Sequence, residues 1–224
     1  MGDIYGRGFV RDDAGNIVYD EVEVNGVTIV RPVLDSEIKK IGNYNPDWTA
    51  GLTNVFRYKN IELRLFLDYR SGGTIFSQTS ALLYRSGIIT ETLPFRFENF
   101  VPDGVIQNAD GSFSTNTTST TGQDFYRSFY QAANVEANSF DATYLKIREA
   151  SIGVNLKPWI PALPFETLHL GIFGRNLWIN TKDDGLRHFD PESMALFGGT
   201  YVPGFEAGQL PNPRTYGFNL RVGF

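Results

Sequence analysis

The last eleven residues, RTYGFNLRVGF, alternate between polar and apolar side chains with a period of two. Successive side chains of a β-strand point to opposite faces of the sheet. One face of this strand therefore carries Tyr216, Phe218, Leu220, Val222 and Phe224, and the other carries Thr215, Gly217, Asn219, Arg221 and Gly223. Such a strand suits a soluble sandwich, which buries the apolar face, and equally a membrane barrel, which turns that face to lipid.

Alternation of this kind predicts five strands in all, at residues 48–59, 61–70, 142–156, 167–180 and 214–224. A two-residue turn at Lys59 and Asn60 joins the first two and predicts a hairpin. The second of these strands, IELRLFLDYR, is apolar on one face and charged on the other. The phase of the alternation changes near Arg148 to Ala150 and again after Gly174, which predicts a β-bulge and a glycine kink.

The connections between these strands differ in length. Residues 71–141 and 183–213 form two long polar connections, and residues 1–41 precede the first strand. In residues 1–41 we expect a hairpin-rich segment with turns at Ala14 to Asn16 and at Asn25 to Gly26. Within the first long connection, SQTSALLYRSG predicts one short helix.

Composition supports an all-β class and excludes several others. Aromatic residues make up 14% of the chain, and 23 glycines are present, as expected for many strands and turns. No run of about 18 apolar residues exists that could form a membrane helix. The absence of cysteine excludes disulfides and thiolate metal sites. A net charge of −5 with scattered basic residues gives no sign of nucleic-acid binding.

The lengths of the strands favour a membrane barrel. Spanning strands need roughly 9–11 residues and carry aromatic girdles at their ends. The predicted strands contain 10 to 15 residues, which is long enough, and carry aromatic residues near their ends. Five strands cannot close a barrel, because about eight are needed. We therefore expect an all-β fold of antiparallel transmembrane strands with long loops, which forms an incomplete barrel on its own and pairs with further strands.

No catalytic constellation or cofactor motif is present in the sequence. The acidic residues Asp183, Asp184, Asp190 and Glu192 raise the possibility of a calcium site, but their spacing does not match an EF-hand and solvated turn residues are favoured. His169 and His188 belong to no metalloprotease motif. A hydrolase would need a pair of carboxylates, and the candidates are Glu62 and Asp68. They are better explained as charges on the water-facing side of a strand. We expect no catalytic residues, no cofactor and no metal.

Five segments resemble one family of transporters. They are GDIYG at residues 2–6, IGNYNPDWTAGLTNVFRYKN at 41–60, FDATYLKIREASIGVNL at 140–156, GRNLWINTKDDGLRHFDPES at 174–193 and PNPRTYGFNLRVGF at 211–224. In this order they resemble the C-terminal part of the SusC/RagA-like TonB-dependent (TonB-linked) outer-membrane transporters. That family imports glycans or peptides together with a surface-exposed SusD-like lipoprotein.

The resemblance implies a location and a set of partners. The strands would belong to a large transmembrane barrel in the bacterial outer membrane, with residues 1–41, 71–141 and 183–213 outside the cell and the C-terminus in the periplasm. The partners would be outer-membrane lipid, the remaining strands and plug of the transporter, the SusD-like lipoprotein and, through parts that this chain lacks, the TonB complex.

The resemblance also assigns candidate residues. The expected lumen-lining residues are Glu62, Arg64, Asp68, Arg70, Arg175, Asn219 and Arg221. The candidates for contact with substrate or lipoprotein are Tyr126, Phe129, Tyr130 and Tyr201, although packing within the loops is favoured for them. The alternating residues Tyr216, Phe218, Leu220, Val222 and Phe224 look like the signal that the barrel-assembly machinery reads. The alternative that remains open is a soluble or surface β-sandwich that binds a ligand.

Overall fold

The computed structural model describes residues 2–162 and 164–224, which form two compact units. The loop unit consists of the residues up to Asn45 together with Thr74–Phe140 and Pro191–Gln209, and the sheet unit consists of Pro46–Gly73, Asp141–Asp190 and Leu210–Phe224. The sequence alone suggested a division at residue 41. In the structure, the leader instead folds together with most of the two long connections.

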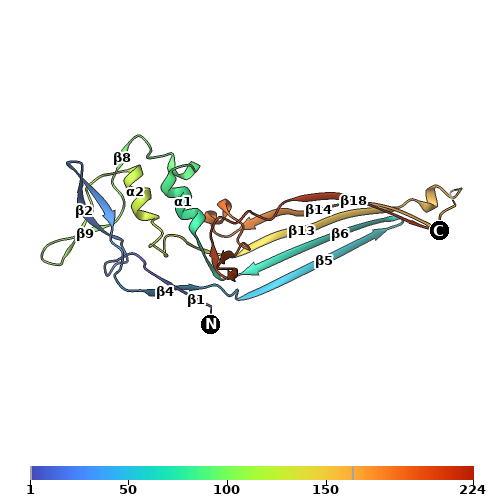
Figure 1. Cartoon of the computed structure of the whole chain (residues 1–224), viewed down its shortest axis with the longest axis horizontal. Helices are drawn as coiled ribbons and strands as arrows, with labels where there is room; N and C mark the ends of the chain where they lie inside the picture. The colour runs from blue at the N-terminus through green and yellow to red at the C-terminus, as the bar shows by residue number, and fades with distance from the viewer. Residues whose placement is uncertain (1, 163) are drawn as a thin grey trace. The chain divides into compact units, whose positions relative to one another are not determined.

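The sheet unit is built on a five-stranded antiparallel sheet (Figure 1). Its strands are β5 (Trp48–Tyr58), β6 (Ile61–Ser71), β13 (Tyr144–Asn155), β14 (Thr167–Thr181) and β18 (Thr215–Gly223), paired in this order. The five segments that alternate in the sequence are those that form this sheet. Strands β5 and β18 are its two edges, and the sheet does not close on itself within the described residues. The all-β class with an incomplete barrel is therefore confirmed.

Strand β13 contains the bulge that the change of phase predicts. Ile147 pairs with Leu67, and Glu149 pairs with the next residue of β6, Phe66, so Arg148 is the extra residue. A bulge lets two adjacent residues point to the same side. Arg148 and Glu149 accordingly share a face with Lys146, whereas simple alternation placed Glu149 on the opposite face.

Strand β14 is irregular after Gly174, but the glycine is not the residue that takes the unusual conformation. Asn176 has a φ of 52°, and together with Leu177 it lies between the residues that pair with Ile147 and Glu149. Gly174 instead allows close packing. A Cβ atom there would lie 2.6 Å from Cδ2 of Leu177 and 3.1 Å from Cδ1 of Tyr216.

The loop unit contains several small sheets. Strand β1 (Asp3–Gly6) pairs with β4 (Lys39–Asn43), β11 (Thr120–Thr121) with β8 (Asn99–Phe100), and β15 (Ala195–Phe197) with β16 (Thr200–Val202). A four-stranded sheet has the order β10 (Phe113–Thr115), β9 (Val105–Gln107), β2 (Val18–Val24) and β3 (Val27–Pro32). A three-stranded sheet has the order β12 (Ser139–Asp141), β7 (Thr74–Ser77) and β17 (Phe205–Glu206).

The turns of the leader follow from local chemistry. Asn25 and Gly26 both have positive φ, 52° and 78°, as a two-residue hairpin between β2 and β3 requires. The Asp12 carboxylate accepts hydrogen bonds from the backbone nitrogens of Ala14 (3.0 Å) and Asn16 (2.8 Å) and so folds the other turn. Both turns lie where the sequence predicts them.

Two α-helices occur among the described residues, α1 (Gln78–Ser86) and α2 (Gly122–Phe129), together with the 3₁₀ turns η1 (Thr90–Thr92), η2 (Lys157–Trp159) and η3 (Asp184–His188). Helix α1 is the one that the sequence predicts. Its N-cap hydroxyl on Ser77 accepts a bond from the Ser80 nitrogen at 3.0 Å, and Gly87 ends it in the left-handed conformation. Among these residues, no helix has the length and hydrophobicity needed to cross a bilayer.

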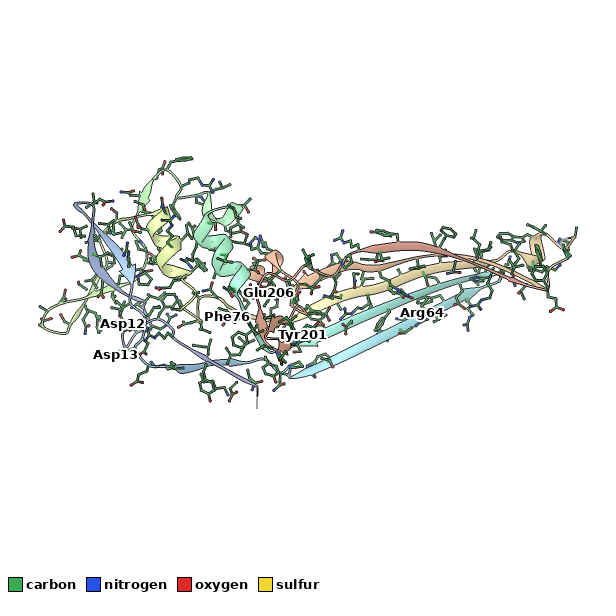
Figure 2. The ribbon with its side chains drawn as sticks, in the orientation of Figure 1. Asp12, Asp13, Arg64, Phe76, Tyr201 and Glu206 are labelled. Atoms are coloured by element: carbon green, nitrogen blue, oxygen red, sulfur yellow. The ribbon has the colours of Figure 1, made fainter. Side chains whose placement is uncertain are left out.

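The loop unit buries a carboxylate, that of Glu206, as well as an apolar core of residues such as Ile4, Val18, Tyr19 and Val30. Glu206 is 1% exposed and accepts hydrogen bonds from the hydroxyls of Ser77 (2.5 Å) and Thr79 (2.6 Å). The backbone nitrogen of Gly208 donates a third bond at 2.7 Å. A buried charge with several donors is tolerated, because these bonds replace the lost water. Figure 2 shows Glu206 beside Phe76 of β7.

Candidate functional site

The polar face of the sheet unit is hollowed. Residues that face one another across the strands share a side of the sheet, for example His169 with Arg221 and Gly171 with Asn219. A cavity of about 880 Å³ lies over this face. Its lining includes five of the seven expected lumen residues, namely Glu62, Arg64, Arg175, Asn219 and Arg221.

Two exposed ion pairs cross this polar face. Arg57 Nε donates to Glu62 Oε2 at 2.7 Å, and Arg175 Nε donates to Glu149 Oε2 at 3.0 Å. Exposed pairs of this kind contribute little to stability, about 0–1 kcal/mol. The pairs fix the direction of these four side chains and occupy the carboxylates of Glu62 and Glu149. Arg64, on the same face, points out from the sheet (Figure 2).

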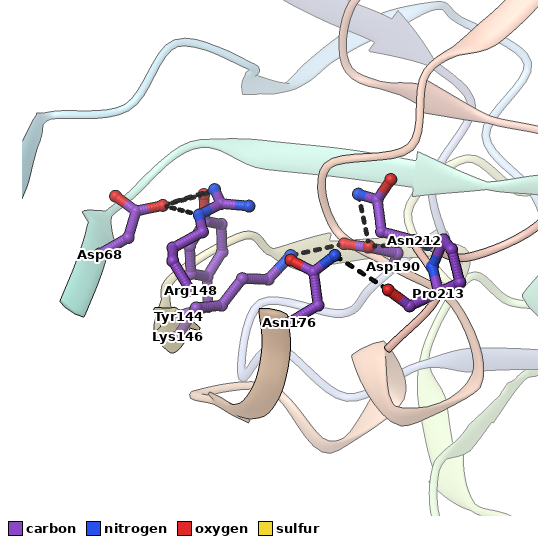
Figure 3. A network of polar contacts seen from close by, with 8 residues as sticks. All are labelled: Asp68, Tyr144, Lys146, Arg148, Asn176, Asp190, Asn212 and Pro213. Atoms are coloured by element: carbon purple, nitrogen blue, oxygen red, sulfur yellow. Dashed lines mark hydrogen bonds and ion pairs between the residues drawn. The ribbon is translucent and has the colours of Figure 1, made fainter. Parts of the chain in front are cut away.

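The other two expected lumen residues lie further along the same face. Asp68 Oδ2 accepts a hydrogen bond from Arg148 Nε at 2.8 Å, which links β6 to the bulge of β13 (Figure 3). Arg70 Nε donates to the carbonyl oxygen of Gly72 at 3.3 Å, at the end of β6. The structure thus brings five of the seven residues around one cavity and places Asp68 and Arg70 beyond it.

Next to Asp68, a buried ion pair joins β13 to the segment that follows η3. Lys146 Nζ lies 2.8 Å from Asp190 Oδ1, and the two side chains are only 8% and 9% exposed. Asn212 Nδ2 donates to the other oxygen of Asp190 at 3.1 Å, and Asn176 Nδ2 donates to the Pro213 carbonyl at 3.1 Å (Figure 3). Both ends of the second long connection are therefore tied to the sheet by polar contacts.

Sequence reasoning missed two residues of the cavity, Glu149 and His169, and the broken alternation was the signal for Glu149. Glu149 and His169 line the cavity with the expected residues, and Arg148 and Lys146 hold the carboxylates of Asp68 and Asp190. A bulge at Arg148 shifts the alternation of β13 by one residue. It thereby places Lys146, Arg148 and Glu149 all on the polar face. His169 opposes Arg221 in the ladder, which fixes its face in the same way.

The opposite face of the sheet is apolar and exposed. Phe56 on β5, Ile172 on β14 and Phe218 on β18 are 59%, 59% and 77% exposed. Leu63, Ile152 and Leu220 on the same face are exposed as well. Scattered apolar residues are ordinary on soluble surfaces, but a continuous face of them indicates contact with lipid or protein.

Aromatic side chains mark the ends of this apolar face. The rings of Trp48 and Tyr69, on neighbouring strands, lie 4.8 Å apart. Tyr58 lies at the other end of β5 and is exposed. Phe224, after the last residue of β18, packs its ring edge-on against Phe165 at 5.1 Å and remains exposed. Aromatic residues at both ends of long strands are typical of membrane–water interfaces.

Three of the four candidate contact residues in the loops pack against one another. Tyr130 stacks on Tyr84 of α1 at a ring distance of 3.9 Å, and Phe129 lies 5.0 Å from Tyr130. Tyr126 donates its hydroxyl to the Glu91 carbonyl at 2.8 Å, and burial is the main cause that raises the pKa of both Tyr126 and Tyr130 above the ordinary value. Tyr201, on β16, is instead 65% exposed.

The acidic residues of the second long connection have protein partners. Asp183 Oδ1 accepts from the Gly185 nitrogen at 2.9 Å, and Asp184 pairs with Arg187. Asp190 pairs with Lys146, as described above. Among the described residues, no group of three or more acidic or histidine side chains is arranged to hold a metal ion.

This sheet and its loops can be compared with proteins of known structure or curated description. No family model matches the sequence. The chain is 26% identical over 218 residues to "TonB-dependent receptor P3" of Formosa agariphila, which covers 95% of this chain and 19% of that protein. The RagAB peptide importer in its closed-closed state superposes with a TM-score of 0.60 at 15% identity, over 98% of this chain and 23% of the matched chain. Its open-open state gives a TM-score of 0.58 at 14% identity.

The resemblance to the SusC/RagA-like TonB-dependent transporters is thereby confirmed. The fold of the sheet and its loops is that of a portion of RagAB. The chain spans about a fifth of the length of the receptor from Formosa agariphila and about a quarter of the matched RagAB chain. These relatives are a receptor and an importer rather than enzymes, in line with the expectation of a non-enzymatic function.

Proposed function

We propose that this chain forms part of the barrel wall, the lumen surface and the external loops of a TonB-dependent outer-membrane transporter. The transporter would import oligosaccharides or peptides in cooperation with a SusD-like surface lipoprotein. The proposal is supported by the curated relative, whose name is that of a TonB-dependent receptor, and by the likeness of the fold to a peptide importer.

The observation that carries the proposal is the two-sided sheet. Its five strands contain between 9 and 15 residues, and the roughly 9–11 residues that span a bilayer fit within this range. One face is apolar, exposed and bounded by aromatic residues, and the other holds ion pairs and a polar cavity. A transmembrane barrel with a wet lumen needs this combination.

The open edges support the same conclusion. Strands β5 and β18 each have one paired neighbour among the described residues. In lipid, unpaired backbone N–H and C=O groups cost several kcal/mol each, so both edges require further strands. We propose that these strands belong to the same transporter and that Tyr216, Phe218, Leu220, Val222 and Phe224 serve as its insertion signal.

The lengths of the connections support one orientation of the chain in the membrane. Long loops face the outside of the cell in outer-membrane barrels, and turns in the periplasm are short. We therefore propose that the loop unit faces outward, where Tyr201 is available to substrate or to the lipoprotein, and that the C-terminus lies in the periplasm. The energy-coupled step would require the TonB complex.

A soluble β-sandwich is the competing function. It would need a second layer over the apolar face of the sheet to remove side chains such as Phe218 and Ile172 from water. The described residues leave both of these side chains exposed. This observation favours the barrel.

The native assembly tests the proposal. Outer membranes of the source bacterium would be solubilised in detergent and probed with an antibody against residues 214–224, followed by intact mass and peptide mapping. We expect a species several times heavier than 25.1 kDa, or this chain together with a larger fragment. A single 25.1 kDa species in the soluble fraction would contradict the proposal and favour the sandwich.

A further inference from the structure

The apolar face of the sheet contains a groove. Its volume is about 580 Å³, and strands β6, β13, β14 and β18 all contribute to its lining (Figure 1). Ala150 of β13 pairs with Gly174 of β14, which pairs in turn with Tyr216 of β18. Gly174 has no side chain and Ala150 has only a methyl group, so this row of the sheet is hollow beside the ring of Tyr216.

Large apolar side chains form the neighbouring row of the sheet. Ile172 pairs with Ile152 on one side and with Phe218 on the other. Ile152 pairs in addition with Leu63 of β6. All four residues line the groove and are exposed. The step from this row to the row of small residues gives the groove its depth.

The lining of the groove suits a hydrocarbon chain. No charged side chain is among the described residues that line it. Ser151 is adjacent to Ala150 in the strand, so its hydroxyl is directed to the opposite, polar face. The phenol group of Tyr216 is then the one polar side-chain group that these lining residues present on the apolar face. An apolar hollow of this kind does not hold water, because water would find too few hydrogen-bond partners there.

A positive charge lies beyond the Tyr216 end of the groove. Arg214 is exposed and stands two residues before Tyr216, the spacing that places residues of an extended chain on one face. Asn176 Nδ2 donates to the carbonyl oxygen of Pro213 at 3.1 Å, which holds this stretch of the chain beside β14. Arg214 has no ion-pair partner among the described residues. Its guanidinium group is therefore available to an anion.

The proposed orientation puts this end of the groove at the external surface of the membrane. Strand β18 would begin there, so Arg214 would lie at the level of the lipid headgroups and Phe218 deeper among the acyl chains. Trp178, which is exposed near the same end of β14, is a residue type found at this level of the bilayer. Basic side chains at a membrane surface attract lipids with anionic headgroups.

We propose that the apolar groove holds an acyl chain of a lipid in the external leaflet, and that Arg214 pairs with the anionic phosphate group of the same lipid. This inference rests on the proposed function, because it requires the apolar face to contact the bilayer. It goes further by assigning one lipid to a fixed position. The charge at the end of the groove favours a lipid over a second copy of the chain, since a two-fold contact centred on the groove would bring two Arg214 side chains together.

Lipid binding to the detergent-purified, full-length protein that contains this chain tests the inference. The probes are phosphatidylglycerol, phosphatidylcholine and diacylglycerol with identical acyl chains, each titrated and read by native mass spectrometry. We expect the Kd of phosphatidylglycerol to be about fivefold lower than the Kd of either other lipid, because only its headgroup carries a net negative charge to Arg214.

Substitutions of arginine test the contact with the headgroup. Arg214→Gln should raise the Kd of phosphatidylglycerol to that of phosphatidylcholine, whereas Arg214→Lys keeps the charge and should keep most of the preference. Arg85→Gln removes the same charge at an exposed position of the loop unit and should leave all three Kd values unchanged.

A larger side chain in the groove tests the contact with the acyl chain. Ala150→Leu keeps the face apolar but fills the hollow, and it should raise the Kd of all three lipids about threefold through the loss of dispersion contacts. Ala50→Leu makes the same change at an exposed position of β5, on the same face and outside the groove, and is the matched control. Heat-modifiable migration on gels shows that each variant is folded.

Four results would overturn the inference. Three are equal Kd values for phosphatidylglycerol and phosphatidylcholine, equal effects of Arg214→Gln and Arg85→Gln, and equal effects of Ala150→Leu and Ala50→Leu. The fourth is a complex of two copies that carries no lipid and that Ala150→Leu separates, which would assign the groove to a second copy. Each of these results would leave the transporter proposal standing, because that proposal is tested by the mass and the membrane location of the native species.

Discussion

Lys146 Nζ and Asp190 Oδ1 lie 2.8 Å apart, with the two side chains 8% and 9% exposed. Strand β13 thus holds the segment after η3 through a nearly buried ion pair. Removing one partner of such a pair leaves an uncompensated buried charge, which costs more than the pair contributes. The relationship makes Lys146 a structural residue rather than a lumen residue open to substrate.

Replacing Lys146 with Met should therefore loosen the connection at residues 183–213. The variant is expected to lose about 3–5 kcal/mol of stability, because the nearly buried Asp190 loses the Lys146 ammonium group. Limited proteolysis of the assembled protein, with cleavage sites read by mass spectrometry, should show new cuts in this connection. The variant Arg57→Met, which removes an exposed ion pair with Glu62, is the matched control and should be cut as the parent protein is.

Neighbouring residues of β6 should respond in opposite ways to substitution. Leu65→Arg places a charge on the apolar face and should cost about 2–4 kcal/mol if that face contacts lipid near the middle of the bilayer. Arg64→Leu changes only the polar face and should leave assembly largely intact. Heat-modifiable migration of the outer-membrane protein on gels measures both, and equal tolerance of the two changes would refute the assignment of faces.

Deletion of Phe224 should reduce assembly in the outer membrane. Its ring follows β18 and contacts Phe165, and the resemblance assigns it to the insertion signal. The measured quantity is the fraction of protein that is protected in the outer membrane compared with the fraction degraded in the periplasm. Replacing Phe224 with Tyr keeps an aromatic terminus and should assemble normally, whereas unchanged assembly after deletion would argue against the signal.

The buried carboxylate of Glu206 should be essential to the order of the loop unit. Glu206→Ala leaves the buried hydroxyl of Ser77 and the part-buried hydroxyl of Thr79 without their acceptor, and an unmet buried donor costs about 1–3 kcal/mol. Hydrogen exchange of β7 and α1, followed by mass spectrometry, should therefore become faster. Glu98→Ala, at an exposed position of the same unit, should leave exchange unchanged.

The sequence predicted the parts of the fold that depend on local pattern. The five strands of the sheet, the turn at Asn25 and the helix beginning at Gln78 each follow from alternation, turn chemistry or capping. Helix α2 was not predicted, although its signal is present: Thr121 caps the Asp124 nitrogen, and Phe125 and Phe129 repeat with helical spacing.

Other features depended on long-range packing and could not be predicted in this way. The partner of Lys146 lies 44 residues along the chain, and that of Glu206 lies 129 residues away. Arg85 of α1 and Arg127 of α2 line one cavity of about 480 Å³ in the loop unit, although they lie in different helices. The periodicity of the sequence does not predict such long-range contacts, because they depend on how the long connections fold.

The pattern of solvent access along β6 and β18 tests the central claim most directly. The chain contains no cysteine, so single cysteines at Glu62, Leu63, Arg64 and Leu65, and at Asn219 and Leu220, add the only spin-labelling sites within it. In outer-membrane vesicles we expect labels at Leu63, Leu65 and Leu220 to be accessible to oxygen from the lipid, and labels at the other three positions to be accessible to a water-soluble nickel reagent. Access of the nickel reagent to both faces, or burial of the apolar face from both reagents, would contradict a transmembrane wall.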